Sequence, residues 1–352
     1  MKPTSAEEVA EVVGSASRVC PVGARTKSGL LGEGEEIDLK QVSGITEYEA
    51  SEYTFTARAG TTVAEVAEAL RDKGQYLPFD PLFVEAGATL GGTVAAGISG
   101  PGRFRYGGIR DFLIGVQFVD GAGQLVRSGG KVVKNAAGFD LPKFFVGSLG
   151  RFGILTELSF KVFPAPFETV TLAIACAEVG VAVERMVEIS CSRWEADALD
   201  FNAQEKEIYV RLGGPGKALR LLAKEAEGRW PGEVREVEDD VWRVARELTW
   251  AEKNCLAKVA LSPSRLESLE NNLGDVEQVA RWYSSGSAVG WLSYEASSTE
   301  KVDRALRESG LAGLQVRGER AGGVRLGKHE DAEIFERVKR ALDPNGRFAA
   351  IY

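Results

Sequence analysis

The stretch ATLGGTVAAGISGPGRFRYGGIRDFLIGV, residues 88–116, decides the fold of this chain. With VKNAAGFDLPKFFVGSLGRFGILTELSFKVFP, residues 133–164, it forms a glycine-dense region, and residues 87–153 contain 17 glycines. Glycine loses more backbone entropy on folding than other residues, so this density needs a physical reason. Tight turns, positive φ angles or a ligand pressed against bare backbone would each provide one. Few prolines and many apolar residues accompany the glycines, which predicts ordered loops between short strands.

The composition limits the class of protein. The chain has 352 residues, which is typical of about two domains. Hydrophobic residues make up 44% and charged residues 27%, as in globular proteins and unlike disordered ones. The net charge is −8 and no long Lys/Arg block occurs, which argues against nucleic-acid binding. No apolar run approaches the ~18 residues of a membrane span, and no signal-peptide pattern opens the sequence, so we expect a cytoplasmic protein.

Cysteine and histidine restrict the chemistry further. The four cysteines form no C-x-x-C pair, so neither a zinc knuckle nor a chain-borne iron–sulfur cluster is expected. The single histidine, His329, excludes a multi-histidine metal site and disfavours a Ser-His-Asp hydrolase. We therefore expect no metal. His329 is either a solvent-facing residue near a helix start or a catalytic base suited to neutral pH, and it is the only histidine available for that role.

Phosphate-binding motifs offer a second line of reasoning. The chain lacks G-x-x-x-x-G-K-[ST] and lacks G-x-G-x-x-G between a strand and a helix, which disfavours nucleoside triphosphatases and nicotinamide-binding Rossmann domains. A nest of successive backbone N–H groups is another way to hold a diphosphate. Two segments suit a nest, namely PVGARTKSG at 21–29 and ATLGGTVAAGISG at 88–100, because small residues and hydroxyls allow close approach.

The residue pattern predicts an α+β protein with a boundary at the Pro164–Pro166 pair. Before it, we expect helices at 5–13 and 61–73 and strands at 17–22, 37–45 and 52–59. All six tryptophans follow the boundary, where strands alternate with helices and two strands stand together mid-way. This order indicates a ferredoxin-like α+β layer, and whether it is duplicated stays open. A terminal helix is expected at 331–342.

These segments resemble the FAD-binding domain of the vanillyl-alcohol oxidase/p-cresol methylhydroxylase (PCMH) type and, within it, the FAD-binding subunits of bacterial glycolate oxidase. The resemblance rests on 21–29, 88–116, 133–164 and LDPNGRF at 342–348. It implies a PCMH-type FAD-binding domain of two subdomains at 1–165, a smaller ferredoxin-like cap domain at 166–325, and a segment at 326–352 that returns to the FAD domain.

The resemblance also implies which residues contact FAD. The diphosphate would meet the backbone of the first loop and the opposite glycine turn, and the flavin and adenine would meet the later loops. The implied contacts are Val22, Gly23, Ala24, Arg25, Thr26, Thr89, Gly91, Gly92, Thr93, Ser99, Gly100, Arg105, Tyr106, Gly107, Gly153 and Ile154. Lys134, Asn135 and Asp140 are expected to have structural roles instead.

The chain departs from the pattern of its relatives in two respects. Neither loop contains the histidine or cysteine through which many relatives attach FAD, so non-covalent FAD is predicted. The cap lacks the histidine cluster common in relatives that oxidise 2-hydroxy acids, which leaves the base and the carboxylate partner unassigned. The candidates for carboxylate binding are Arg243, Arg246, Arg281, Arg317 and Arg325, and Tyr283 or Tyr294 are alternatives to His329 as base.

Three hypotheses about function follow. In the first, the chain is a flavoprotein subunit that helps oxidise a small 2-hydroxy acid, with a larger FAD subunit and an iron–sulfur subunit as partners. In this hypothesis the expected cytoplasmic protein could associate with a membrane through its partner subunits. In the second, it binds FAD as a structural or electron-relay subunit without substrate chemistry. In the third, it is a stand-alone FAD reductase that uses NADPH.

Overall fold

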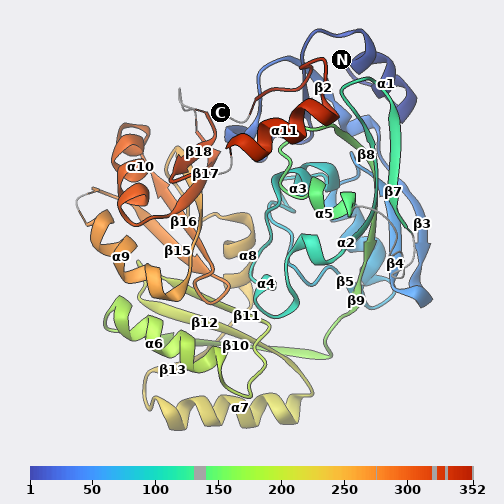
Figure 1. Ribbon diagram of the computed structural model, residues 1–352. Coiled ribbons are helices and arrows are strands. Elements are labelled where there is room, and N and C mark those ends of the chain that lie inside the picture. The colour runs from blue at the N-terminus through green and yellow to red at the C-terminus, as the bar shows by residue number, and fades with distance from the viewer. Residues whose placement is uncertain (131–139, 275, 319–322, 330–331, 351–352) are drawn as a thin grey trace. The chain divides into compact units, whose positions relative to one another are not determined.

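The computed structural model describes residues 1–130, 140–274, 276–318, 323–329 and 332–350. The chain divides into two compact units (Figure 1). The first comprises Met1–Ser99, Gly108–Ala165 and Glu330–Tyr352, and the second Gly100–Gly107 and Pro166–His329. None of the described helices has the length and apolar character that a membrane crossing requires. The expected domain bounds remain predictions, and the structure adds that Gly100–Gly107 pack with the second unit.

The first unit is built on a five-stranded antiparallel sheet in the order β3-β4-β8-β6-β7. Aromatic residues fill one side of it, since Phe55 stacks on Phe160 with ring centroids 5.4 Å apart and Phe79 lies against Phe160 at 6.5 Å. The strands are β3 (Ile45–Glu49), β4 (Thr54–Arg58), β6 (Leu113–Val119), β7 (Leu125–Gly129) and β8 (Ile154–Lys161), with the short pair β5 (Gln75–Tyr76) and β9 (Phe163–Pro164) beside them.

Short helices connect these strands. Helix α2 (Val63–Arg71) confirms the helix expected at 61–73 and begins with a capping box, in which Thr62 and Glu65 satisfy each other's backbone N–H. The others are α3 (Leu90–Ala96) and α5 (Leu141–Phe145), with 3₁₀ turns at Ser28–Leu30, Leu39–Gln41, Ala50–Glu52 and Ile109–Asp111.

A smaller layer joins the start of the chain to its end. Helix α1 (Ala6–Ser15) packs Val9 and Val13 against the parallel strands β1 (Val19–Val22) and β2 (Glu35–Asp38). Phe348 completes this core, and Val19 N–H donates to the carbonyl of Arg347 at 2.7 Å. The terminal helix α11 (Ala332–Leu342) lies in the same unit, as the sequence predicts for 331–342.

The second unit confirms the predicted ferredoxin-like layer and resolves the open question of duplication. Two β-α-β-β-α-β modules follow one another along the chain (Figure 1). The first contains β10 (Glu168–Ala175), α6 (Val179–Ser190), β11 (Ala198–Asn202), β12 (Glu207–Gly214), α7 (Gly216–Arg229) and β13 (Val234–Val237). The second contains β14 (Cys255–Ala260), α9 (Pro263–Leu273), β15 (Ala280–Ser284), β16 (Val289–Tyr294), α10 (Thr299–Glu308) and β17 (Ala312–Arg317).

The two modules share one nine-stranded sheet in the order β13-β10-β12-β11-β15-β16-β14-β17-β18. Their second strands, β11 and β15, pair antiparallel through Phe201↔Tyr283 and Asn202↔Trp282. Residues of α6, α9 and α10, such as Met186, Leu269 and Leu306, pack in one core with the sheet. Further elements of this unit are α4 (Arg103–Tyr106), α8 (Asp240–Glu247), β18 (Arg325–Gly327) and a 3₁₀ turn at Ala296–Ser298.

One strand prediction is wrong. The sequence predicts a strand at 37–45, but β2 ends at Asp38 and β3 begins at Ile45. The Asp38 side chain accepts the backbone N–H of Lys40 at 3.1 Å, which turns the chain out of the strand. Leu39 and Val42 are buried in this turn. The alternating apolar residues therefore reflect a turn packed on the core, and periodicity alone could not distinguish it from a strand.

Candidate cofactor site

The first unit contains an open pocket between three of its loops. One wall is the loop that follows β1, from Pro21 to Lys27. A second wall is the start of α3 with Thr89, Gly91 and Gly92, and a third is the turn from Leu149 to Gly153. Leu30, Leu31, Leu39, Ala59, Ala95, Ala96 and Leu155 complete an apolar lining.

The β1 loop presents backbone donors to this pocket. Among the described residues, the backbone N–H groups of Ala24, Arg25 and Thr26 have no hydrogen-bond acceptor. Arg25 has φ 59°, the left-handed conformation that turns successive N–H groups of a loop towards one point. Its guanidinium is held by Glu36, with Nη1 2.8 Å from Oε1. This hydrogen bond lowers the pKa of Glu36 and raises the pKa of Arg25, so the ion pair fixes the loop to β2.

Glycine is required where the three walls meet. A Cβ on Gly23 would lie 2.5 Å from Oγ1 of Thr89. That hydroxyl caps α3 by accepting the N–H of Gly92, so it cannot simply rotate away. A Cβ on Gly150 would lie 2.6 Å from Cγ of Pro21, and its φ of 68° also disfavours a side chain. The pocket is thus a cradle formed by bare backbone, as the glycine density predicts.

A cationic side chain also lines the pocket. Lys27 is buried, and its ammonium donates to Oγ1 of Thr26 at 3.1 Å and lies 5.2 Å from the centre of the Phe83 ring. Three successive N–H donors, one lysine and an apolar remainder suit an elongated ligand with an anionic centre and planar rings. The residues present therefore fit FAD, and the described lining contains no histidine or cysteine to which it could be attached.

The pocket brings together nine of the sixteen residues implied by the resemblance, and the other seven lie elsewhere. Thr93 donates its hydroxyl to the carbonyl of Thr89, Ser99 accepts the N–H of Ile109, and Ile154 begins β8 in the buried core. Gly100, Arg105, Tyr106 and Gly107 belong to the second unit. The nine that line the pocket are Val22, Gly23, Ala24, Arg25, Thr26, Thr89, Gly91, Gly92 and Gly153.

Sequence reasoning missed several lining residues. Lys27 lies inside the PVGARTKSG stretch, and Leu149 and Gly150 lie inside GSLGRFG. The motifs that predict the cofactor site therefore already contain these three lining residues. Leu39, Ala59 and Leu155 belong to strands and turns, and no local sequence pattern indicates that these segments approach the pocket. Of the residues expected to be structural, Lys134 and Asn135 lie outside the described residues, and Asp140 caps α5 through the N–H of Lys143.

Arg105 and Tyr106 make a polar cluster within the second unit. Arg105 Nη1 lies 2.9 Å from Oδ1 of Asp197, its Nη2 lies 2.9 Å from Oε2 of Glu195, and the Tyr106 hydroxyl donates to the same Asp197 oxygen. Burial lowers the pKa of Arg105, but Tyr106, Asp197 and Glu195 together outweigh it and raise the pKa above its usual value. This cluster ties α4 to the segment before β11.

The candidates for substrate chemistry are scattered and already have partners. Nε2 of His329 lies 2.7 Å from the carbonyl of Leu326, and its Nδ1 lies 3.5 Å from Arg325. The Tyr283 hydroxyl donates to Glu270 and the Tyr294 hydroxyl to Gln315, both in the helix-side core. The remaining arginines bind as follows: Arg243 to Asp240, Arg246 to the Trp242 carbonyl, Arg281 to Glu270, and Arg317 to the carbonyls of Ala251 and Lys253.

The described residues contain no cluster of three or more His, Cys, Asp and Glu side chains able to hold a metal ion. Of the four cysteines, Cys20, Cys176 and Cys255 are buried and Cys191 is exposed. Burial raises the pKa of the Cys176 thiol to about 11, which disfavours its thiolate and any redox or ligand role.

Comparison with known proteins decides the family. A family described as FAD binding domain matches residues 1–129. Glycolate oxidase subunit GlcE of Escherichia coli strain K12 is 32% identical over 97% of this chain and 94% of its own length. The chain belongs to the GlcE family. It is therefore an FAD-binding oxidoreductase of the PCMH type, and the resemblance seen in the sequence is confirmed.

More distant relatives share part of the chain. Glycolate oxidase subunit GlcD of Bacillus subtilis is 30% identical over 64% of this chain, and D-lactate dehydrogenase of Anaerostipes hadrus is 32% identical over 60%. The GlcE-type chain spans about half the length of these two relatives. Its fold matches alkyldihydroxyacetonephosphate synthase with a TM-score of 0.70 at 16% identity, over 98% of this chain and 75% of that one.

Proposed function

We propose that this chain is the FAD-binding subunit of a glycolate oxidase-type complex that oxidises a small 2-hydroxy acid. Bound FAD would supply the acceptor for the hydride on C2 of the substrate, and a base would take the hydroxyl proton. Partner subunits would then accept the two electrons. A larger FAD subunit is proposed as one partner, because GlcD is among the relatives. An iron–sulfur subunit is proposed as another, because this chain has no C-x-x-C pair.

The observation that supports this proposal is the cradle of the first unit. Its three unpartnered N–H groups, the glycines at the meeting of its walls and Lys27 offer the donors and the close approach that a dinucleotide diphosphate requires. We propose the nine lining residues named above as FAD contacts, with Lys27 and Gly150 added. Binding without a covalent bond is proposed because the described lining has no histidine or cysteine.

A second candidate function deserves a test because the chain has only one histidine, and that histidine already contacts Leu326 and Arg325. In this alternative, the chain binds FAD as an electron-relay subunit, and the substrate chemistry takes place on a partner.

An absorption spectrum of the purified chain separates these functions. The spectrum is recorded before and after anaerobic addition of glycolate, D-lactate or NADPH. Bound flavin that bleaches with a hydroxy acid is expected, and it supports the catalytic role. Flavin that stays oxidised until partner subunits are added supports the relay role. Bleaching by NADPH alone would indicate a reductase, and a chain that takes up no FAD would contradict the whole proposal.

A further inference from the structure

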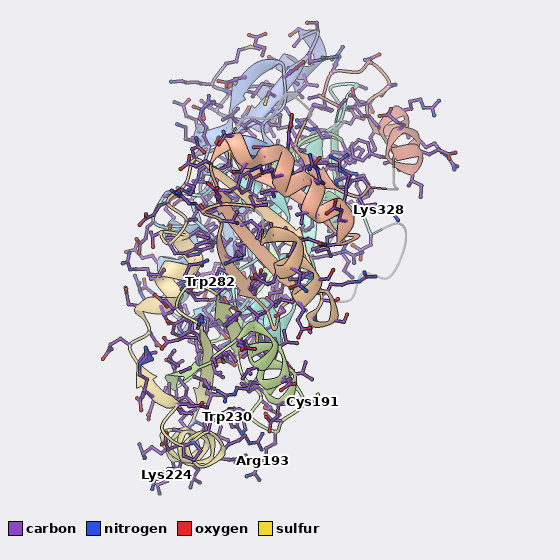
Figure 2. All side chains as sticks on the ribbon, turned by 90° about the vertical axis from the view of Figure 1, so that its left-hand side faces the viewer. Cys191, Arg193, Lys224, Trp230, Trp282 and Lys328 are labelled. Carbon is purple, nitrogen blue, oxygen red and sulfur yellow. The ribbon has the colours of Figure 1, made fainter. Side chains whose placement is uncertain are left out.

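Arg151 is a buried cation in the turn that forms one wall of the cofactor pocket. Cations of folded proteins usually extend into solvent, as Arg193 and Lys224 of the second unit do (Figure 2). Arg151 is only 3% exposed, and it follows Gly150, which lines the pocket. Burial of a charge is costly unless a partner compensates for the lost hydration. The groups around Arg151 therefore indicate its role.

These groups provide little compensation. Nη2 of Arg151 donates to the carbonyl of Leu30 at 3.1 Å, and Nε is buried without an acceptor. Within the described ranges of the chain, no carboxylate forms an ion pair with this guanidinium. Nη1 lies beside Gly32, where an added Cβ would be only 1.9 Å from it. A guanidinium with five donors thus has a single neutral carbonyl as its side-chain partner.

The thiol of Cys20 does not supply the missing negative charge. Burial lowers the pKa of Arg151, and Cys20 opposes this shift. Burial also raises the pKa of the Cys20 thiol above its usual value, so the thiol is neutral at pH 7. The guanidinium keeps its proton in proteins. The positive charge of Arg151 is therefore buried without a counter-charge from these neighbours.

The guanidinium lies next to the lining of the pocket. Leu30, whose carbonyl it binds, lines the pocket together with Leu149, Gly150 and Gly153 of the turn. The same turn contains a second unsatisfied polar atom, the buried hydroxyl oxygen of Ser148. Two buried polar groups with unsatisfied atoms in one turn are unusual in a folded protein, and they suit a turn that meets a polar ligand.

We propose that Arg151 provides the buried counter-charge for the diphosphate of FAD. This inference rests on the proposed assignment of the pocket to FAD, and it adds a side chain that the resemblance does not imply. The two charges interact through protein, where their attraction is stronger than between groups exposed to water. Arg151 thereby links cofactor binding to stability. Its charge lowers the stability of the FAD-free chain and favours the chain with FAD bound.

Two measurements on the full chain test this link. The Kd of FAD is measured from flavin fluorescence during titration of FAD-free protein, and stability is measured as the urea midpoint without FAD. Arg151→Met removes the charge and is expected to raise the Kd of FAD about tenfold or more. The urea midpoint of the FAD-free variant should stay the same or rise, because an uncompensated buried charge is removed. A purely structural role of Arg151 would instead lower that midpoint.

Three comparisons make the test specific to charge and to the diphosphate. Arg151→Lys keeps the charge and should keep the Kd of FAD within about threefold. Arg71→Met removes an exposed arginine in the last turn of α2 and should leave the Kd and the midpoint unchanged. ADP, which carries the diphosphate without the flavin, is titrated as a competitor of FAD. Its Kd should rise in Arg151→Met by the same factor as that of FAD.

Failure of the inference and failure of the proposed function give different results. An FAD Kd that is unchanged in Arg151→Met would overturn the inference and leave the proposed function intact. A lower urea midpoint of the FAD-free variant, or a loss of FAD affinity that ADP does not share, would do the same. A chain to which no FAD binds would overturn both.

Discussion

Arg105 and Asp197 are joined by a 2.9 Å ion pair although they stand 92 positions apart in the sequence. Asp197 is only 2% exposed, and its Oδ1 accepts from both the Arg105 guanidinium and the Tyr106 hydroxyl. The segment Gly100–Gly107 is thereby held to the second unit while the chain on either side of it belongs to the first.

Arg105→Met should destabilise the second unit, because a buried carboxylate loses its charged partner. We expect the free energy of unfolding to fall by about 1–3 kcal/mol in urea titrations. Limited proteolysis should also cut within 100–107 sooner. Arg193→Met is the control, since Arg193 is 82% exposed and solvent screens its pair with Glu225. Equal unfolding curves for the two variants would contradict the prediction.

Gly23→Ala should weaken FAD binding while the chain still folds. The added Cβ meets Oγ1 of Thr89 and forces apart the β1 loop and the start of α3, so we expect the FAD Kd to rise at least about tenfold. Flavin fluorescence during titration of FAD-free protein measures this. Gly14→Ala is the matched control, because its Cβ meets no atom within 4 Å and the position is helical. A Gly23→Ala chain that retains FAD normally would show that the loop has room to move.

Asp200 should make stability depend on pH. Its carboxylate is fully buried between Trp282, Ser284 and Ser285, and burial raises its pKa from 3.8 to about 6. Between these values the folded chain binds a proton that the unfolded chain does not. The contribution of Asp200 is therefore present at acidic pH and is lost as the pH rises through about 6, by up to about 3 kcal/mol.

Denaturant unfolding of the unaltered chain and of Asp200→Asn between pH 4.5 and 7.5 tests this. The stability difference between them should change across the window, whereas Asp72→Asn, at an exposed position, should run parallel to the unaltered chain at every pH. A constant difference for Asp200→Asn would mean that the carboxyl keeps one protonation state throughout.

Lys339→Met should destabilise the packing of the C-terminal segment against the first unit. The buried ammonium donates to the carbonyl of Arg151 at 2.9 Å and to Asp343 at 2.7 Å, and Asp343 accepts the N–H groups of Arg347 and Phe348. Removal of the lysine leaves Asp343 buried without its cation, which we expect to lower stability by about 3 kcal/mol. Thermal unfolding measures the loss. Arg340→Met, on the exposed side of α11, should leave the midpoint within about 1 °C.

The sequence patterns predict the helices and strands of this chain well. They do not predict which strands pair when they lie far apart in the sequence. The Thr62–Glu65 capping box and the strand–helix alternation after Pro166 are local signals, so α2 and the ferredoxin-like layer could be anticipated. The pairing of β11 with β15 could not be anticipated. Phe201 and Tyr283 are paired although they lie 82 positions apart in the sequence, and no local sequence pattern indicates this contact between the edges of the two modules.

The same limit applies to the site. The N–H donors of the β1 loop follow from a contiguous motif, and that part of the cradle was predicted. Leu155 of β8 was not singled out, because a buried strand residue looks like an ordinary core residue until the structure shows that it also lines the pocket.

The hydrogen bond from Val19 to Arg347 has a consequence for how the flavoprotein is made. Strand β1 leads directly into the loop that offers three N–H groups to the cofactor, and Phe348 packs beneath it. A nascent chain still on the ribosome exposes the loop long before residues 347 and 348 emerge from the exit tunnel. FAD capture in the cell should therefore follow the emergence of residues 347 and 348, and a translation product truncated before residue 347 should be recovered without flavin.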